Sequence, residues 1–302
     1  MQGIIDFLTS ANILFEENVD GKRLCSFHVG GKVRLVVKPK NAEQLTGLYA
    51  YLNENKIENI LLGKGSNVVI NDDGFDGIVV LLSELARVDF DITDDNCIVA
   101  GAGASMFKLA NFAQQNGLCG LEFAQGIPGS VGGGVYMNAG AYGGEISSVL
   151  KSCLVFDIAT GEIFIAYSKQ CDFSYRHSVF MENKDLIVLF ATFELKKGNS
   201  DEIKARMDEM RAKRQTSQPL EYPSAGSTFK RPEGHFAGKL IEDSGLKGFA
   251  IGGAQVSEKH AGFVINRGGA TCDDIRKLVE HIQKTVKEKF DVSLECEIEF
   301  VE

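Results

Sequence analysis

A glycine-rich and uncharged stretch, residues 126–144, constrains this chain more than any other feature of its sequence. Eight of its 19 residues are glycine, and none is Lys, Arg, Asp or Glu. Glycine tolerates positive φ and lets a ligand approach the backbone closely, and successive backbone N–H groups in such turns form anion-binding concavities. Apolar residues recur through the stretch, which favours a packed segment over a long flexible loop. We therefore predict a cradle for a diphosphate, built from main-chain atoms.

A second glycine turn, Gly-Lys-Gly-Ser-Asn, lies upstream at residues 63–67 between two apolar segments. Neither stretch is a standard phosphate motif, because neither ends in Gly-Lys-Ser/Thr. Residues 126–144 also lack the spacing of a Gly-x-Gly-x-x-Gly turn and the acidic residue that follows it at the ribose distance. Gly-Ser-Asn turns alone are common in loops. Two such cradles in one chain fit one extended ligand with two phosphates, such as FAD.

Composition excludes several classes of protein. With 302 residues, 44% hydrophobic and 24% charged, the chain resembles a soluble globular protein of one to three domains. A net charge of −9 argues against sequence-independent nucleic-acid binding. It does not exclude an anionic substrate, because an acidic protein can contain a local basic pocket. Seven cysteines without Cys-x-x-Cys spacing predict reduced thiols in the cytoplasm. We expect no signal peptide and no membrane span.

Hydrophobic periodicity predicts a mixture of helices and strands. Helices are expected at residues 2–17, after a cap at Asn41, at 105–116, at 201–214 after a cap at Asn199 or Ser200, at 237–244, and after Thr271. Strands are expected at 33–37, 60–62, 68–70, 78–82, 87–92, 98–100, 186–195 and 292–300, with a hairpin formed by 154–158 and 163–166. The pattern changes near residues 197–216, and we place the boundary between two domains, 1–198 and 199–302, there.

Three further motifs accompany the glycine turns. They are Phe-Ser-Tyr-Arg-His-Ser at 173–178, Pro-Ser-Ala-Gly-Ser-Thr-Phe-Lys at 223–230, and Gly-Gly-Ala-Gln-Val-Ser at 252–257. Together with the turns they resemble, in the same order, the UDP-N-acetylenolpyruvoylglucosamine reductase family, from about residue 24 to residue 300. Five motifs in order are far more specific than any one of them. The short stretch between residues 178 and 223 resembles the shorter class of this family, which lacks an inserted loop there.

The resemblance implies an α+β fold and a reaction. Residues 1–198 would form a vanillyl-alcohol-oxidase-type FAD-binding fold of two α+β subdomains, and residues 199–302 an α+β substrate-binding domain. The implied reaction is the NADPH-dependent, FAD-mediated reduction of UDP-N-acetylglucosamine enolpyruvate to UDP-N-acetylmuramate, a cytoplasmic step toward peptidoglycan. We expect tightly bound, non-covalent FAD, NADPH as hydride donor, a small-molecule substrate and a monomer. The residues expected to hold FAD are Gly63, Gly65, Ser66, Asn67, Gly126, Pro128, Gly129, Ser130, Gly132, Gly133 and Asn138.

The resemblance assigns catalysis to three residues. Arg176 would bind the substrate carboxylate and stabilise the negative charge that develops when hydride reaches C3. Ser227 would donate the proton to C2. Glu297 would supply the carboxyl group; Glu295 is the alternative if the alignment is shifted by two residues, and Glu299 stands where the family usually has Arg. Without the resemblance, these residues would be interpreted as a surface cation, a turn serine and a solvated strand face.

Five residues are expected to contact the uridine diphosphate of the substrate or the phosphate of NADPH: Tyr175, Lys230, Arg231, Lys259 and His260. A lone histidine such as His260 is more often structural than functional. No histidines have metal-site spacing, so no metal is expected.

Two other functions remain open from the residues. A flavin oxidase of the same fold would use oxygen, but no His or Cys lies within residues 126–144 to attach FAD covalently. A non-catalytic flavin or sugar-nucleotide binding module would lack one of the three catalytic residues, and all three are present. The fold alone does not decide between these functions.

Overall fold

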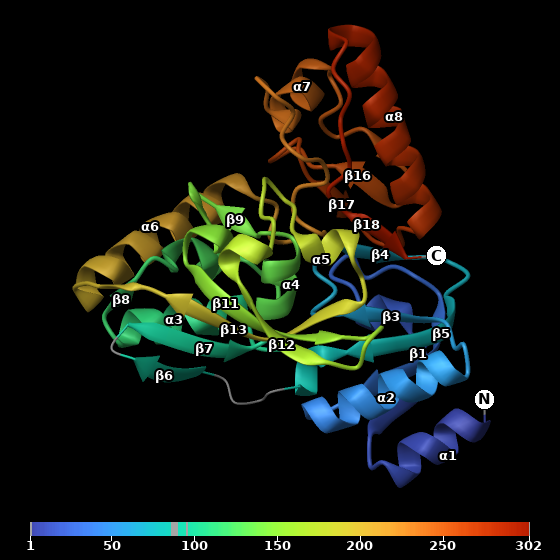
Figure 1. Cartoon of the computed structure of the whole chain (residues 1–302). Helices are drawn as coiled ribbons and strands as arrows, with labels where there is room; N and C mark the ends of the chain where they lie inside the picture. Colours follow the sequence, from blue (N-terminus) through green and yellow to red (C-terminus); the bar gives the residue numbers. More distant parts are fainter. Residues whose placement is uncertain (1, 86–89, 95, 302) are drawn as a thin grey trace. The chain divides into compact units, whose positions relative to one another are not determined.

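The computed structural model in Figure 1 describes residues 2–85, 90–94 and 96–301. The chain forms two compact units, each assembled from segments that are separated in the sequence. The first unit contains Met1–Glu16, Leu35–Lys64 and Gly77–Ala212; the second contains Glu17–Arg34, Gly65–Asp76 and Lys213–Glu302. The two units alternate along the chain, because each consists of three separate segments. The single domain boundary expected between residues 198 and 199 stays a prediction.

The chain begins with helices and a sheet of order β1-β2-β5-β3. The elements are α1 (Gln2–Ser10), β1 (Leu14–Asp20), β2 (Lys32–Lys38), α2 (Ala42–Glu54), β3 (Asn59–Leu62) and β5 (Phe75–Leu81), with β3 parallel to β5. As predicted, Asn41 caps α2, because its side chain accepts the Gln44 N–H at 2.9 Å. The expected helix over 2–17 is wrong beyond Ser10: Asn12 takes a left-handed φ of 53°, and the chain turns into β1.

A five-stranded antiparallel sheet of order β12-β11-β13-β7-β6 forms the other sheet of the first unit. Its strands are β6 (Phe90–Asp94), β7 (Cys97–Gly101), β11 (Leu150–Asp157), β12 (Ile163–Tyr167) and β13 (Leu186–Glu194). The predicted hairpin is confirmed, with Cys153 opposite Ala166. Part of the strand expected at 87–92, residues 87–89, lies outside the described residues.

Short elements complete the first unit and surround its sheets. The helix α4 packs against β13 and β7. The elements are α3 (Met106–Gln115), β8 (Leu118–Cys119), α4 (Val131–Tyr136), β9 (Gly140–Ala141), β10 (Gly144–Glu145), α5 (Val179–Glu182), β14 (Lys196–Lys197) and α6 (Ser200–Ser217), with 3₁₀ turns η2 (Leu82–Glu84), η3 (Glu122–Gly126), η4 (Ile146–Ser148) and η5 (Ser168–Gln170). Asn199 caps α6, because its side chain accepts the N–H groups of Asp201 and Glu202.

One continuous core holds the first unit together. Leu45 and Leu48 of α2, Phe156 of β11 and Phe193 of β13 are all buried in it. Burying a side chain of this size stabilises a fold by about 1.5–3 kcal/mol relative to exposure. This apolar core fixes the loops that carry the glycine stretch 126–144.

The second unit combines early and late segments of the chain. Its elements are η1 (Gly21–Arg23), β4 (Val68–Ile70), α7 (Ala237–Asp243), β15 (Ala250–Ile251), β16 (Ala254–Val256), β17 (Val264–Asn266), α8 (Cys272–Phe290) and β18 (Glu299–Val301). The sheet β15-β16-β17 packs against α8, and β18 pairs in parallel with β4. The long strand expected at 292–300 is wrong, because only Glu299–Val301 forms a regular strand.

Within the residues that Figure 1 shows in colour, no helix has both the length and the apolar character needed to cross a membrane.

Candidate active site

The start of the 63–67 turn meets the glycine stretch 126–144 in the first unit. Gly63, which follows β3, lies so close to the Ser130 hydroxyl that a Cβ on residue 63 would overlap it. The Ser130 side chain is only 2% exposed and also accepts the Gly133 N–H at 3.3 Å. Residue 63 therefore lies directly against the glycine stretch, and the expectation that both turns face one ligand stays a prediction.

The glycine stretch 126–144 is more ordered than a loop. Residues 131–136 form α4, which sequence reasoning missed because three of its six residues are glycine, a poor helix former. The helix starts after Pro128, Gly129 and the cap Ser130. Close packing requires glycine at position 132, because the Cβ of any other residue there would lie 2.9 Å from the Cβ of Ala102. Tertiary contacts thus override the local preference of these residues.

Several expected cofactor residues also serve the chain itself. Gly65 has a left-handed φ of 61°, and a side chain there would overlap the Leu24 carbonyl. Ser66 offers its carbonyl to the Ser26 hydroxyl at 3.4 Å. Gly126 ends η3. Part of the glycine pattern in these turns therefore reflects close packing of backbone as well as any ligand.

Free main-chain donors remain in both turns. Among the described residues, the backbone N–H groups of Lys64, Gly65, Ser66 and Asn67 donate to no acceptor, nor do those of Gly129 and Ser130. Buried or partly buried N–H groups normally find a partner. Within the first unit, the donors of Lys64, Gly129 and Ser130 fit a phosphate group, so the residues present there are compatible with the phosphates of FAD.

The predicted cation Arg176 occupies a tight turn in the first unit. Ser174 and His177 exchange both backbone hydrogen bonds at 3.2 Å, which leaves Tyr175 and Arg176 as a two-residue loop. Arg176 has a φ of 54°, unusual for a residue other than glycine. Its guanidinium donates to the carbonyls of Asn138 at 3.4 Å and Gly140 at 2.7 Å. The turn and these bonds hold the cation in one orientation.

Asn138 holds this turn in place through a side-chain hydrogen bond to Ser174. Its side chain is fully buried, donates to the Ser174 carbonyl at 2.9 Å and accepts the Ser147 N–H at 2.9 Å. Its φ of 44° is one that Asn tolerates better than most residues. The structure therefore shows Asn138 as a link between the glycine stretch and the Arg176 turn; its expected contact with FAD stays a prediction.

The second unit brings Ser227 and Glu297 onto neighbouring segments. Phe229 forms an antiparallel bridge with Cys296. The Glu297 N–H donates to the Thr228 carbonyl at 2.8 Å, and the Lys230 N–H donates to the Glu295 carbonyl at 2.9 Å. Residues 227–230 thus run alongside 295–298. Burial raises the pKa of the Cys296 thiol to about 11.

Ser227 itself is available for chemistry. Its side chain is exposed, and its hydroxyl has no hydrogen-bond partner among the described residues. The preceding Gly226 has a φ of 76°, with open space where a side chain would be. A serine at this position can therefore turn its hydroxyl toward a bound molecule without losing an internal bond.

Thr228 is a residue that sequence reasoning missed. It is fully buried; its N–H donates to the Gly262 carbonyl at 2.9 Å, and its hydroxyl accepts the Val264 N–H at 3.0 Å. Its carbonyl accepts the Glu297 N–H. Thr228 thus fixes Ser227 between two loops. The only available signal was its place inside the 223–230 motif.

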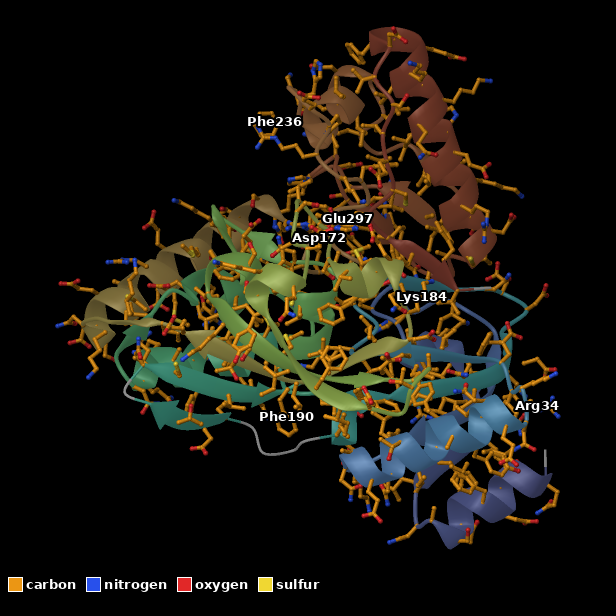
Figure 2. The ribbon with its side chains drawn as sticks, viewed as in Figure 1. Arg34, Asp172, Lys184, Phe190, Phe236 and Glu297 are labelled. Carbon is orange, nitrogen blue, oxygen red and sulfur yellow. The ribbon has the colours of Figure 1, made fainter. Side chains whose placement is uncertain are left out.

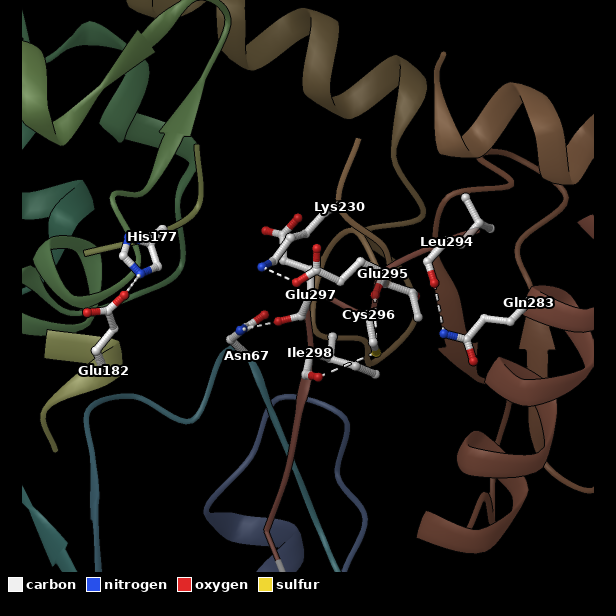
Figure 3. A network of polar contacts seen from close by, with 11 residues as sticks. Asn67, His177, Glu182, Lys230, Gln283, Leu294, Glu295, Cys296, Glu297 and Ile298 are labelled. Carbon is white, nitrogen blue, oxygen red and sulfur yellow. Dashed lines mark hydrogen bonds and ion pairs between the residues drawn. The ribbon is translucent and has the colours of Figure 1, made fainter. Parts of the chain in front are cut away.

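Asn67 connects the first glycine turn to the Glu297 segment within the second unit. Its side-chain amide donates to the Glu297 carbonyl at 2.9 Å, and its own carbonyl accepts the Glu299 N–H at 2.9 Å (Figure 3). The parallel pairing of β4 with β18 continues this contact. The turn that we expect to hold FAD and the expected catalytic carboxylate are therefore parts of one local assembly.

The expected substrate contacts have differing surroundings. Tyr175 is 49% exposed, next to Arg176 in its turn, and Lys230 forms an ion pair with Glu295 at 2.5 Å. Arg231 lies 4.0 Å from the ring of Phe236, which is exposed and labelled in Figure 2.

Lys259 and His260 lie in the loop before β17. The Lys259 ammonium donates to the Gln215 carbonyl at 2.8 Å. The His260 ring accepts the Gly262 N–H at 3.1 Å through Nδ1, and burial lowers its pKa. Roles for all five expected substrate residues stay predictions.

Across the described part of the chain, no three His, Cys, Asp or Glu side chains are grouped closely enough to hold a metal ion.

Residues 33–166 match a family described as an FAD binding domain, and residues 218–301 match the UDP-N-acetylenolpyruvoylglucosamine reductase, C-terminal domain. A protein named UDP-N-acetylenolpyruvoylglucosamine reductase from Clostridium novyi (strain NT) is 49% identical over 95% of this chain and 92% of its own length. This chain belongs to the UDP-N-acetylenolpyruvoylglucosamine reductase family.

Other members support the same assignment. The reductase of that name from Listeria monocytogenes serotype 4a is 50% identical over 90% of both chains. The crystal structure of UDP-N-acetylenolpyruvylglucosamine reductase from Thermus caldophilus superimposes with a TM-score of 0.81 at 32% identity, covering 96% of this chain and 100% of the other. The expected α+β fold with a vanillyl-alcohol-oxidase-type FAD-binding part is confirmed, and the protein is an FAD-dependent oxidoreductase of this reductase family.

Proposed function

We propose that this protein reduces UDP-N-acetylglucosamine enolpyruvate to UDP-N-acetylmuramate in the cytoplasm, with NADPH as the hydride donor. The family supports the reductase reaction, and the free main-chain donors in the two glycine turns support FAD. All seven cysteines are free thiols, which is typical of proteins in reducing compartments. The product is a peptidoglycan precursor.

Each protein group has a distinct part in this proposal. Bound FAD would accept hydride from NADPH and deliver it to C3 of the enolpyruvyl group. Arg176, held by two backbone carbonyls, stabilises the negative charge on the substrate carboxylate. Ser227 then gives its proton to C2, and Glu297 lies on the segment paired with it. Contacts to the uridine diphosphate of the substrate or to the phosphate of NADPH come from Lys230, Arg231, Lys259, His260 and Tyr175.

One observation carries the proposal most directly. The Ser227 side chain is exposed, and its hydroxyl has no hydrogen-bond partner among the described residues. The adjacent backbone is held in place by the hydrogen bonds of the buried Thr228. A weak acid needs accurate placement to protonate a carbanion-like carbon, and this arrangement supplies a fixed backbone with a free hydroxyl.

The Ser227→Ala variant tests the assignment by separating the two half-reactions. We expect NADPH to bleach the flavin absorbance at the wild-type rate, because Ser227 takes no part in that step. Recovery of the absorbance on adding the enolpyruvyl substrate should slow by about a hundredfold or more, as for loss of a general acid. Stopped-flow absorbance under nitrogen measures both rates.

Ser217→Ala is the matched control. Ser217 is an exposed residue at the end of α6 whose hydroxyl donates to the Lys213 carbonyl. It should behave as wild type in both half-reactions. Normal substrate reduction by Ser227→Ala would show that another group supplies the proton.

A further inference from the structure

The Arg176 turn belongs to a loop of the first unit that is closed at its base. The Val179 N–H donates to the Cys171 carbonyl at 2.8 Å, so the chain entering the loop meets the chain leaving it. Cys171 and Ser178 are both fully buried, and the Ser178 hydroxyl donates to the Tyr136 carbonyl at the end of α4. The base of the loop is therefore fixed by hydrogen bonds of buried residues.

The side chain of His177 connects the two sides of this loop. Its Nδ1 lies 3.3 Å from the carbonyl oxygen of Asp172, five residues earlier in the chain. Its Nε2 lies 3.1 Å from a carboxylate oxygen of Glu182, the last residue of α5 and five residues later (Figure 3). One imidazole ring thus bridges the segments that precede and follow Arg176.

Both partners of the His177 ring can only accept hydrogen bonds. A carbonyl oxygen and a carboxylate have no proton to donate, so each contact needs an N–H of the ring. A neutral imidazole has one N–H and satisfies one partner, whereas the protonated ring satisfies both and also forms an ion pair with Glu182. The surroundings of His177 therefore suit a positively charged ring that donates from both nitrogens.

His177 is also part of the turn that carries the cation. Its backbone and that of Ser174 exchange two hydrogen bonds at 3.2 Å, which close the turn directly after Arg176. Arg176 has a φ of 54°, and a residue other than glycine keeps such a conformation only where its surroundings support it. A fixed His177 ring restricts the backbone next to Arg176 and so supplies part of that support.

We propose that His177 is a positioning residue for Arg176. Its bonds to the Asp172 carbonyl and the Glu182 carboxylate keep the turn in the conformation that presents the guanidinium to the substrate carboxylate. This inference rests on the proposed role of Arg176 in substrate reduction. Without the bridge, the loop stays folded through its buried base, but the guanidinium is held less accurately. A misplacement of about 1 Å can cost a catalytic group about a hundredfold in rate.

Stopped-flow absorbance of the FAD-loaded protein under nitrogen tests this role. We expect His177→Ala to leave bleaching of the flavin by NADPH at the wild-type rate. Recovery of the absorbance with saturating enolpyruvyl substrate should slow by about tenfold, because Arg176 is misplaced. The substrate concentration that gives half-maximal recovery should rise by no more than about threefold, because the charge of Arg176 remains. Glu182→Ala should slow recovery less than His177→Ala, because the Asp172 contact remains.

A double variant separates positioning from a general effect on the fold. Arg176→Ala alone should slow recovery by about a hundredfold or more, as for loss of a group that stabilises developing charge. Adding His177→Ala to it should cause no further loss, because His177 acts only through Arg176. A further loss of about tenfold in the double variant would overturn the inference, because the two residues would then act independently.

Asp185→Ala is the matched control. Asp185 is an exposed carboxylate that follows α5, and its side chain has no partner within the described residues. It should match wild type in both half-reactions. The thermal midpoints of His177→Ala and Glu182→Ala should stay close to the wild-type value, because the Glu182 side chain is 64% exposed and such ion pairs stabilise a fold little.

Two other results would overturn the inference in different ways. Wild-type recovery in His177→Ala and Glu182→Ala, together with slow recovery in Arg176→Ala, would show that the His177 bridge has no part in catalysis, and the proposed function would stand. Wild-type recovery in Arg176→Ala would remove the proposed role of Arg176 and this inference together.

Discussion

At the scale of single residues, this protein uses polar side chains to hold backbone in uncommon conformations. Arg176 and Asn138 both have positive φ, and each is bonded to main-chain groups of the other's segment. Such conformations cost about 1–3 kcal/mol and persist where surrounding contacts determine them, often at functional sites. The Arg176 turn is therefore expected to be sensitive to changes in residues that never touch the substrate.

Asn138→Ala should destabilise the protein by about 2–4 kcal/mol. The substitution removes a fully buried side chain, leaves the Ser147 N–H without its acceptor, and removes one of the two hydrogen bonds that the Ser174 carbonyl accepts. Urea unfolding followed by circular dichroism measures the effect. Asn183→Ala, at an exposed position, should change stability by less than about 0.5 kcal/mol. An equally small loss for Asn138→Ala would show that water replaces its bonds.

Acid should destabilise the second unit through His260. Burial lowers the folded-state pKa of His260 below its ordinary value of 6.5, so the unfolded chain binds this proton more readily. The associated stability is present above about pH 6.5 and is lost as pH falls through the folded-state pKa. We expect His260→Gln to lose less unfolding free energy than wild type between about pH 7.5 and about pH 5.5.

Chemical denaturation at the two pH values gives these differences directly. His235→Gln, at an exposed position, is the control and should follow wild type. A His260→Gln variant with the same loss as wild type would assign the acid sensitivity to other groups.

At the scale of elements, segments distant in sequence cap and pair with one another inside the second unit. The Asp72 carboxylate accepts the Cys272 N–H at 2.8 Å and the Asp273 N–H at 2.9 Å, at the start of α8. Thr271 and Asp274 form a capping box at the same end. These bonds explain why residues 65–76 group with the C-terminal part of the chain rather than with their sequence neighbours.

Asp72→Ala should weaken this end of α8 by about 1–2 kcal/mol, because it removes an acceptor and a negative charge from a helix N-terminus. The free energy of unfolding measured with urea checks the loss. Asp73→Ala, which removes the neighbouring exposed charge, should be nearly neutral. Similar effects for the two variants would mean that the Thr271 box alone fixes the helix start.

Local signals predicted many elements correctly, and long-range pairing decided the rest. Asn41 was identified as a cap, and a helix was expected after Thr271, because both signals depend on residues within about one turn. The helix α4 was missed because its glycines disfavour a helix until β13 packs against it. The alternation at 292–300 predicted a long strand, but only its last residues find a partner strand, in β4.

In the candidate site too, local sequence signals identified some residues, whereas contacts between distant segments decided the rest. Ser227 and Glu297 were named from motifs, and their pairing depends on a bridge between Phe229 and Cys296 that no periodicity reveals. Thr228 and the bonds of Asn67 to residues 297 and 299 were not foreseen, because they join segments far apart in the chain. Sequence identifies the chemical groups, whereas the fold decides which of them share one loop or ladder.

At the scale of the whole molecule, the proposed residues are distributed over both compact units. Arg176 and the Gly63–Ser130 contact belong to the first unit, whereas Ser227 and Glu297 belong to the second. Reductases with 49% and 50% identity match most of this chain, and the Thermus caldophilus enzyme shares its fold. We therefore propose that this one chain carries both the cofactor-binding and the proton-donating groups of the reductase.

The most direct test of this claim is an anaerobic absorbance trace of the purified wild-type protein in the flavin band. NADPH is added first, and UDP-N-acetylglucosamine enolpyruvate second. The account predicts bleaching on the first addition and full recovery on the second, without oxygen. Recovery only after air is admitted would point to an oxidase and would contradict the proposed substrate. A protein without a flavin spectrum, even after FAD is supplied, would contradict the proposal that this protein uses FAD to reduce the substrate.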